Sequence, residues 1–285
     1  MSEIQQKALI FGAGATGKAL LKSVQKKYEV IGFLDNDKQK WESDEGICGI
    51  TVFAPSKIFE MDYDVVVIGT YVGLDPLTEQ LLEMGVARGK IDQSFILLAV
   101  LSRVTFLESL GELFDESGIQ GCVAEGGVFQ GDFAKEINRV FPSRRFYLFD
   151  TFTGFDKRDV ELEQKKSYSE PGSGHFNVTS EELVLSKLPH PEMCILRKGY
   201  FPESTEGIDE IFCFVNLDFD LYKPILAGLE FFYPRMVKGG IILVHEYFSD
   251  SYRGVREAVT DFITGKDGLR LFPIGDGLSI GIYCD

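Results

Sequence analysis

The chain has 285 residues, of which 45% are hydrophobic and 24 are Phe, so it is long enough for two domains with separate cores. Its net charge of -15 argues against a nucleic-acid backbone or an anionic membrane surface as the main partner. The five cysteines form no Cys-x-x-Cys pair, no apolar run is long enough to span a membrane, and the N-terminus lacks the layout of a signal peptide. We therefore expect a cytoplasmic protein whose partner is a small molecule.

The first predicted elements form the turn of a dinucleotide-binding fold. A strand at residues 7–11 leads into a Gly-x-Gly-x-x-Gly turn and a helix, and the next strand ends on an acid. In Rossmann folds these glycines let the backbone approach a pyrophosphate, and the acid accepts hydrogen bonds from ribose hydroxyls. The candidate residues for binding NAD(P) or another nucleotide are Gly12, Gly14, Gly17 and Asp35. The stretch also resembles the Rossmann-type modules attached to polysaccharide-biosynthesis enzymes.

A further strand at 62–69 and a helix at 76–84 complete this module, which ends near residues 91–100. We place the two predicted domains at 1–104 and 105–285. The first domain contains no Tyr-x-x-x-Lys pair, so hydride chemistry there has no visible acid. Two interpretations stay open: the module binds a nucleotide, or it is a scaffold through which the chain forms a homo-oligomer.

The second domain repeats the order of strand, turn and helix with a different turn. A strand at 120–125 ends on Glu125, a glycine turn at 126–131 follows, and the next strand ends on Asp150. The turn lacks the Gly-x-Gly-x-x-Gly spacing, which fits a ligand that has no pyrophosphate to hold.

A polar insertion at 156–179 follows the second strand of this domain. Its glycines and serines flank Tyr168, His175 and Phe176, a composition typical either of a mobile lid over a substrate or of an ordinary surface loop. His175 is the residue of this insertion that we predict to take part in catalysis.

Two short apolar runs later in the chain, 215–217 and 241–244, predict adjacent buried strands joined by an amphipathic helix at 224–233. The carboxyl ends of parallel strands meet at the same edge of a sheet. Four polar side chains should therefore share one crevice there: Asp218, Asp220, His245 and Glu246. Carboxylates that are brought together out of water repel each other, so we expect a cation among them.

Several motifs occur in an order that resembles the macrocin/mycinamicin sugar O-methyltransferase family over roughly residues 105–285. The motifs span residues 125–131, 147–154, 198–202, 216–222 and 239–247. The resemblance implies a class I S-adenosylmethionine-dependent methyltransferase fold, in which an antiparallel strand pair at 269–274 and 278–284 ends the chain. The predicted fold class is α/β, with two Rossmann-like domains and mainly parallel sheets.

The resemblance also implies where S-adenosylmethionine binds. Glu125 would receive its ammonium group, and Asp150 would accept its ribose hydroxyls. The turn that contains Gly127 and Gly131 would let the backbone approach the methionine part of the cosubstrate.

By the same resemblance, a divalent cation that activates the acceptor hydroxyl would lie among Asp218, His245 and Glu246. The family usually has Asp-Asp-Tyr where this chain has His245, Glu246 and Tyr247, and an imidazole ligand suits Mn²⁺ better than Mg²⁺. Three interpretations stay open: a metal site with altered preference, a metal-free site in which His245 is the general base, or a degenerate site. We expect a retained metal, with Asp218 and His245 in catalytic roles.

Two functions from different classes follow. The first is an S-adenosylmethionine-dependent, metal-assisted O-methyltransferase that acts on a sugar hydroxyl, whether in a nucleotide-linked sugar, a surface glycan or a glycosylated natural product. The second is a non-catalytic protein in which the first domain senses a dinucleotide and the second is a degenerate methyltransferase domain.

Overall fold

The computed structural model of this chain describes residues 5–41, 46–70, 74–172, 174–266 and 268–285. The chain divides into two compact units, Met1–Leu101 and Ser102–Asp285, and each unit has its own sheet. The observed fold confirms the predicted class, two α/β units with mainly parallel sheets. The change from one unit to the other falls inside helix α3 (Ser94–Glu116), which the sequence analysis did not predict.

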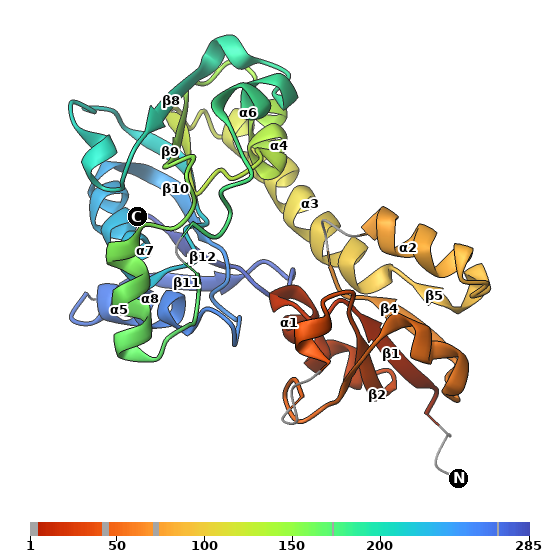
Figure 1. Ribbon diagram of the computed structural model, residues 1–285. Coiled ribbons are helices and arrows are strands. Elements are labelled where there is room, and N and C mark those ends of the chain that lie inside the picture. Colours follow the sequence, from red (N-terminus) through yellow and green to blue (C-terminus); the bar gives the residue numbers. More distant parts are fainter. Residues whose placement is uncertain (1–4, 42–45, 71–73, 173, 267) are drawn as a thin grey trace. The chain divides into compact units, whose positions relative to one another are not determined.

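The N-terminal unit contains a five-stranded parallel sheet in the order β3-β2-β1-β4-β5 (Figure 1). Its strands are β1 (Lys7–Phe11), β2 (Glu29–Leu34), β3 (Val52–Phe53), β4 (Val65–Ile68) and β5 (Ile91–Asp92). Helix α1 (Ala15–Gln25) and the start of α3 cover one face of this sheet, and α2 (Leu74–Glu83) covers the other. Because both faces are covered, β1 and β4 are uninterrupted apolar runs.

The C-terminal unit contains a seven-stranded sheet in the order β11-β12-β10-β9-β6-β7-β8. Its strands are β6 (Cys122–Gly126), β7 (Phe146–Asp150), β8 (Cys194–Lys198), β9 (Phe212–Leu217), β10 (Met236–Val244), β11 (Arg270–Pro273) and β12 (Ile280–Tyr283). Strand β12 is antiparallel to both β10 and β11, and the other neighbouring strands are parallel. This arrangement confirms the predicted antiparallel pair at the end of the chain.

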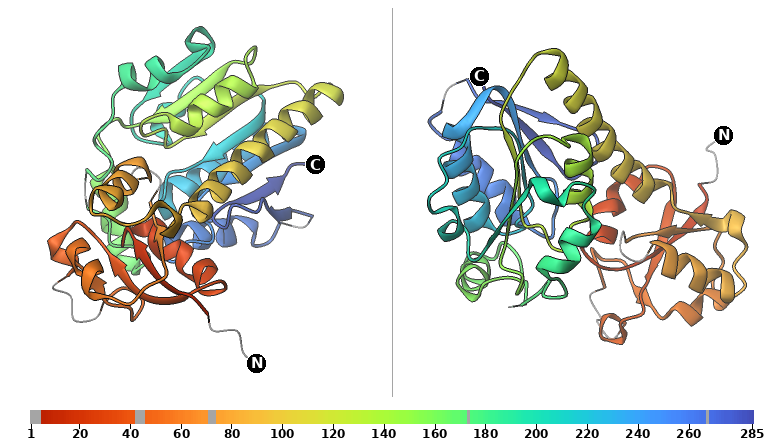
Figure 2. Two further views of the ribbon diagram at one scale, coloured as in Figure 1. Left: turned by 90° about the vertical axis from the view of Figure 1, so that its right-hand side faces the viewer. Right: turned by 90° about the horizontal axis from the view of Figure 1, so that it is seen from above.

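Helices cover both faces of the seven-stranded sheet (Figure 2). On one face lie α7 (Tyr222–Phe232) and α8 (Arg253–Ile263), and α5 (Lys157–Lys166) packs beside α7. On the other face lie α3, α4 (Asp132–Val140) and α6 (Glu181–Lys187). The polar residues predicted from the sequence follow the carboxyl ends of the parallel strands of this sheet.

The sequence analysis found no apolar run long enough to span a membrane, but helix α3, with 23 residues, is long and apolar enough to do so by length and composition alone. Some of its side chains, however, pack in the hydrophobic core of the unit to which they belong. Ile96 packs in the N-terminal unit, and Leu107, Leu110 and Phe114 pack in the C-terminal unit. Part of its apolar surface therefore belongs to the two cores, whereas Leu97, Leu98, Val100, Leu101 and Leu113 are exposed.

Candidate active site

Four strands of the C-terminal unit carry their polar residues to one edge of the sheet. Backbone hydrogen bonds fix this edge: Asp218 N donates to Gly126 O at 2.8 Å, and His245 N donates to Leu217 O at 2.9 Å. The turns after β6 and β9 and the end of β10 therefore lie side by side, as the sequence predicts for parallel strands.

Glu125 is a buried carboxylate with one free oxygen. Its Oε1 accepts a hydrogen bond from Asn216 Nδ2 at 2.8 Å, whereas Oε2 is buried without a hydrogen-bond partner among the described residues. Burial first, and then the charge of Asp218, raise the pKa of Glu125 well above its ordinary value. A buried acid with an unpaired oxygen is suited to receive a cationic donor such as the ammonium group of S-adenosylmethionine.

Asp150 holds the turn that follows β6. Its Oδ2 accepts from Phe129 N at 2.9 Å and its Oδ1 accepts from Phe152 N at 2.7 Å. Burial raises the pKa of Asp150, although these backbone N–H groups oppose the rise. Each carboxylate oxygen has a second lone pair, so the predicted hydrogen bonds to ribose hydroxyls are compatible with these contacts.

The glycines of the same turn are required by the fold itself. Gly127 has φ +81°, and a Cβ on it would lie 2.1 Å from the carbonyl oxygen of Asp218. Gly131 has φ +79° at the N-terminal cap of α4, where a Cβ would lie 3.1 Å from Val184. Their presence is explained by sterics, so the prediction that they contact the cosubstrate is not tested by the geometry.

His245 and Asp218 form a pair at the ends of β10 and β9. The imidazole Nδ1 lies 3.0 Å from Asp218 Oδ1, within ion-pair distance, although the angle does not make a hydrogen bond. Burial alone would raise the pKa of Asp218, but the charges of His245 and Arg103 outweigh burial and lower it. The predicted meeting of these two strand ends is present in the structure.

Arg103, in α3, is a member of this site that the sequence analysis missed. Its Nη2 donates to Asn216 Oδ1 and to Asp218 Oδ2, both at 3.0 Å, and its guanidinium carbon lies 3.8 Å from the centre of the Phe133 ring. The available signal was a single Arg in the middle of an apolar helix, because such a charge is rarely buried without a partner.

Asp220 and Glu246 extend the acidic group. Burial, together with the charges of Asp218 and Glu246, raises the pKa of Asp220 well above its ordinary value. Glu246 Oε1 lies 3.6 Å from His245 Nδ1, and its Oε2 is buried without a hydrogen-bond partner in the described part of the chain. Burial and then the charge of Asp220 also raise the pKa of Tyr252.

The predicted metal ligands do not form a metal site in this arrangement. Oδ2 of Asp218 is bonded to Arg103, and Oδ1 faces His245. Across the residues that the structure describes, no three His, Cys, Asp or Glu side chains are grouped so that they could hold a metal ion. The sequence prediction of a divalent cation held by Asp218, His245 and Glu246 is therefore not supported by the geometry.

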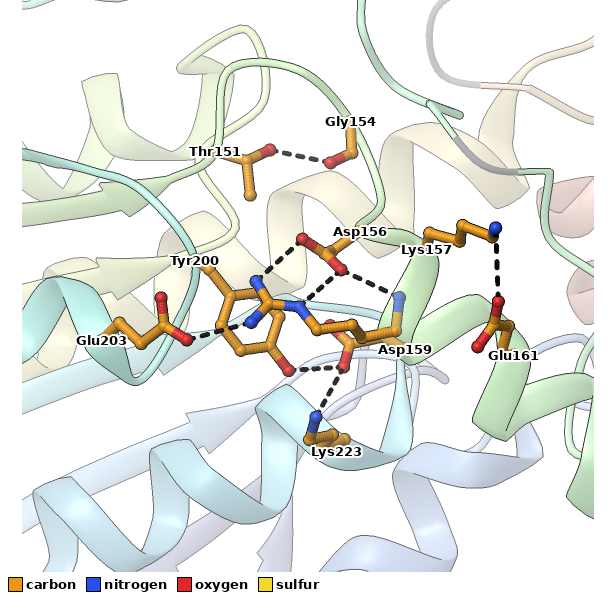
Figure 3. Close-up of polar contacts among 10 residues, drawn as sticks. Thr151, Gly154, Asp156, Lys157, Asp159, Glu161, Tyr200, Glu203 and Lys223 are labelled. Atoms are coloured by element: carbon orange, nitrogen blue, oxygen red, sulfur yellow. Dashed lines mark hydrogen bonds and ion pairs between the residues drawn. The ribbon is translucent and has the colours of Figure 1, made fainter.

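The first half of the polar insertion is helix α5, which is tied to the rest of the unit (Figure 3). Arg158 donates to both carboxylate oxygens of Asp156 at 2.9 and 3.0 Å and lies 3.5 Å above the Tyr200 ring. Tyr200 in turn donates to Asp159 at 2.7 Å, and Lys223 Nζ lies 3.8 Å from the same carboxylate (Figure 3). This helix is anchored to the motif at 198–202 and to α7, so the predicted lid is limited to the stretch after Ser167.

That second stretch lies against the turn after β6. Gln130 Nε2 donates to Val178 O at 2.8 Å, and the Phe129 and Phe176 rings meet edge to face at 5.0 Å. His175 is exposed and stacks on Phe155 at 5.8 Å. No contact within the described ranges joins His175 to the strand-end pair, so its catalytic role stays a prediction.

The three glycines of the N-terminal turn have different structural reasons. Gly12 has φ +112°, and a Cβ on Gly17 would lie 1.9 Å from Gly12 O, so both are required by the fold. Around Gly14, by contrast, no heavy atom of the described residues, apart from Gly14 and its two chain neighbours, lies within 4 Å of the position of a Cβ. Asp35 Oδ2 accepts from Ala13 N and from Lys40 Nζ, both at 2.8 Å.

The chain is similar to known proteins both in sequence and in structure. The profile of a family described as Macrocin-O-methyltransferase (TylF) matches residues 98–269, and one described as C2185-like, N-terminal matches residues 4–92. The 8-demethyl-8-(2,3-dimethoxy-alpha-L-rhamnosyl)-tetracenomycin-C 4'-O-methyltransferase of Streptomyces olivaceus is 24% identical over 190 residues, which are 60% of this chain and 72% of that protein.

Two solved structures share the fold. The calicheamicin methyltransferase CalS11 has a TM-score of 0.53 at 20% identity, covering 74% of this chain and 91% of its own. The O-methyltransferase NovP has a TM-score of 0.52 at 18% identity, covering 65% of this chain and 80% of its own.

The protein is an S-adenosylmethionine-dependent O-methyltransferase of class I. This follows from the fold, from the acids at the strand ends and from the similarity to the family and structures above. The family can be stated more narrowly, because its profile matches more than half of the chain. The chain belongs to the macrocin-O-methyltransferase family, and its N-terminal unit is C2185-like. The family predicted for the C-terminal unit is thereby confirmed.

Proposed function

We propose that this protein transfers the methyl group of S-adenosylmethionine to a hydroxyl group of a sugar. The observation that carries the proposal is the convergence, at one sheet edge, of the unpaired buried oxygen of Glu125 with the pair formed by Asp218 and His245. The Streptomyces olivaceus relative is named as the 4'-O-methyltransferase of a tetracenomycin that bears a rhamnosyl group, which supports a sugar as the acceptor.

The residues that would hold S-adenosylmethionine are Glu125 for its ammonium group and Asp150 for its ribose, beside the turn of Gly127 and Gly131. When bound, S-adenosylmethionine supplies an activated methyl group on a sulfonium leaving group. The free oxygen of Glu125 and the second lone pairs of Asp150 fit these partners. The protein has then to align the acceptor and to remove one proton.

In this proposal His245 removes the proton of the acceptor hydroxyl. Asp218, 3.0 Å from Nδ1, orients the ring and stabilises the imidazolium that forms when the proton is taken. Metal assistance, which the family resemblance implied, has no step in this scheme because Asp218 is already paired with Arg103 and His245.

The test is methyl transfer to a panel of nucleotide-linked deoxysugars, read as S-adenosylhomocysteine formation and as the mass of the methylated product. His245→Ala should lower kcat by about 10²- to 10⁴-fold, the usual contribution of a general base, while S-adenosylmethionine affinity measured by calorimetry stays the same. His190→Ala is the matched control, because His190 lies in the loop before β8. Full activity of His245→Ala, or no binding of S-adenosylmethionine to the wild type, contradicts the proposal. His175→Ala in the same assay tests the other predicted histidine.

A nucleotide at the N-terminal unit is a second candidate function, favoured by the open space beside Gly14. The backbone of Gly14 is extended, with φ −91°, so neither conformation nor a described neighbour requires a glycine there. A ligand that approaches the backbone closely would explain a glycine at this position, and so would its place as the N-cap of α1. Thermal shifts with NAD⁺, NADP⁺ and nucleotide sugars test this proposal, and no shift with any of them favours the scaffold interpretation.

A further inference from the structure

The strand-end site gathers four acidic side chains, whose mutual repulsion is relieved either by protonation or by a nearby positive charge. These residues are Glu125, Asp218, Asp220 and Glu246. Burial raises the pKa of both Glu125 and Asp220, and Arg103 is a cation whose charge opposes the rise in each. The sequence predicted that a cation would lie among these carboxylates, and the structure places an arginine there.

The guanidinium of Arg103 is held from two directions. Its Nη2 donates to Asn216 Oδ1 and Asp218 Oδ2, both at 3.0 Å, and its guanidinium carbon lies 3.8 Å from the centre of the Phe133 ring. Arginine is suited to this combination, because its planar charge stacks on an aromatic ring while its N–H groups bond oxygen. Asn216 also donates to Glu125, so the same contact connects the ends of β9 and β6.

This placement competes with a divalent ion for the same oxygens. An ion at Asp218 would have to displace Arg103 from Oδ2 or His245 from the 3.0 Å contact with Oδ1. It would also be repelled by the guanidinium, and Mg²⁺ needs a near-octahedral set of oxygen ligands.

We propose that Arg103 is the resident cation of this site and occupies the position at which a divalent ion would otherwise neutralise Asp218. Arg103 is then a positioning residue, which bonds Asp218 Oδ2 and leaves Asp218 Oδ1 facing His245. The inference rests on the proposed methyl transfer for its chemical meaning, but it can be tested by metal binding alone.

The experiment is a titration of the full-length chain with Mn²⁺, followed by electron paramagnetic resonance, for the wild type, Arg103→Met and Arg103→Met/Asp218→Asn. The wild type should show no Mn²⁺ site that depends on Asp218. Arg103→Met should bind one Mn²⁺ at least about tenfold more tightly than the wild type, because it leaves the acids without their cation. The double variant should lose this gain.

Arg103→Lys is the control variant, since it keeps the charge and should not gain the site. A wild-type Mn²⁺ site that Asp218→Asn abolishes overturns the proposal, and so does an Arg103→Met chain that binds S-adenosylmethionine normally but gains no Mn²⁺. If Arg103→Met does not fold, Mn²⁺ binding by the wild type is compared with Mn²⁺ binding by Asp218→Asn. Only a wild-type site that Asp218→Asn abolishes would then contradict the proposal. Absence of methyl transfer with every acceptor would count against the proposed function and leave these metal-binding outcomes readable.

Discussion

The two units hold their first turn in the same way. In the N-terminal unit Ala13 N donates to Asp35 Oδ2 at 2.8 Å, and in the C-terminal unit Phe129 N donates to Asp150 Oδ2 at 2.9 Å. In each case an acid after or at the end of the second strand stabilises the turn that follows the first strand.

The surroundings of the two acids are opposite. Lys40 Nζ lies 2.8 Å from Asp35, whereas Asp150 forms no salt bridge within the described part of the chain and burial raises its pKa. Strand β1 is wholly apolar where it nears its turn, whereas β6 contains Glu125 with its unpaired oxygen. The shared turn therefore identifies the fold, and the different pairing of Asp35 and Asp150 distinguishes the two units.

The largest expected effect comes from matched glycine substitutions in the two turns. Gly127→Ala should destabilise the C-terminal unit by about 3 kcal/mol or more, because it combines a left-handed backbone with a Cβ 2.1 Å from Asp218 O. Gly14→Ala should change stability by less than about 1 kcal/mol, since its backbone is extended and the described neighbours leave space. Urea unfolding of both variants measures this, and equal losses would contradict the steric explanation.

The next effect compares the two acids. Asp150→Ala should weaken S-adenosylmethionine binding by roughly 1 to 3 kcal/mol, or about 5- to 150-fold, because hydrogen bonds to a charged group are lost. Asp35→Ala should leave that affinity unchanged, because its unit is not the one proposed to bind the cosubstrate. Calorimetry measures the affinity of both variants for S-adenosylmethionine. An equal loss of affinity in the two would contradict the assignment of the ligand to Asp150.

A smaller effect concerns Glu125, whose pKa is raised on folding. The folded state then holds the proton more tightly, so stability is full below the ordinary carboxyl pKa of about 4.3 and is lost as pH rises towards the folded pKa. Glu125→Gln should remove this loss, since the amide keeps an oxygen for Asn216 Nδ2, and it should weaken S-adenosylmethionine by about tenfold. Urea midpoints between about pH 4 and 8 check the sign, and parallel pH profiles for wild type and variant would disprove the assignment.

The sequence was sufficient for the sheets and for the meeting of Asp218 with His245. Buried parallel strands are short apolar runs, and their carboxyl ends share one edge, so residues at those ends can be placed together without coordinates. The antiparallel pair at the chain's end was implied by the family resemblance, and the structure contains it as β11 and β12.

Arg103 and α5 could not be predicted in the same way. Contact between residues 103 and 218 depends on how α3 packs on the sheet, which no local period specifies. Helix α5 has the sequence KRDVELEQKK, whose few apolar residues give no amphipathic face, and tertiary contacts through Arg158 and Asp159 hold it. The sequence prediction of a metal did not include this arginine, whose bond to Asp218 Oδ2 depends on the packing of α3.

The smallest expected effect tests the pairing that distinguishes Asp35. Burial alone would raise the pKa of Asp35, but Lys40 and two backbone N–H groups, one of them from Ala13, outweigh burial and lower it. Stability from this acid is therefore present above its ordinary pKa of about 3.9 and is lost as pH falls through the folded value. Lys40→Met should cost about 0.5 to 1 kcal/mol near neutral pH and reduce the loss on acidification, because the pair is only partly buried. Lys57→Met is the control, since Lys57 pairs with Glu60 on the exposed surface. Urea unfolding at neutral and acidic pH measures the stability of both variants. If Lys40→Met and Lys57→Met lose stability equally at both pH values, the proposed electrostatic difference between the two turns is wrong.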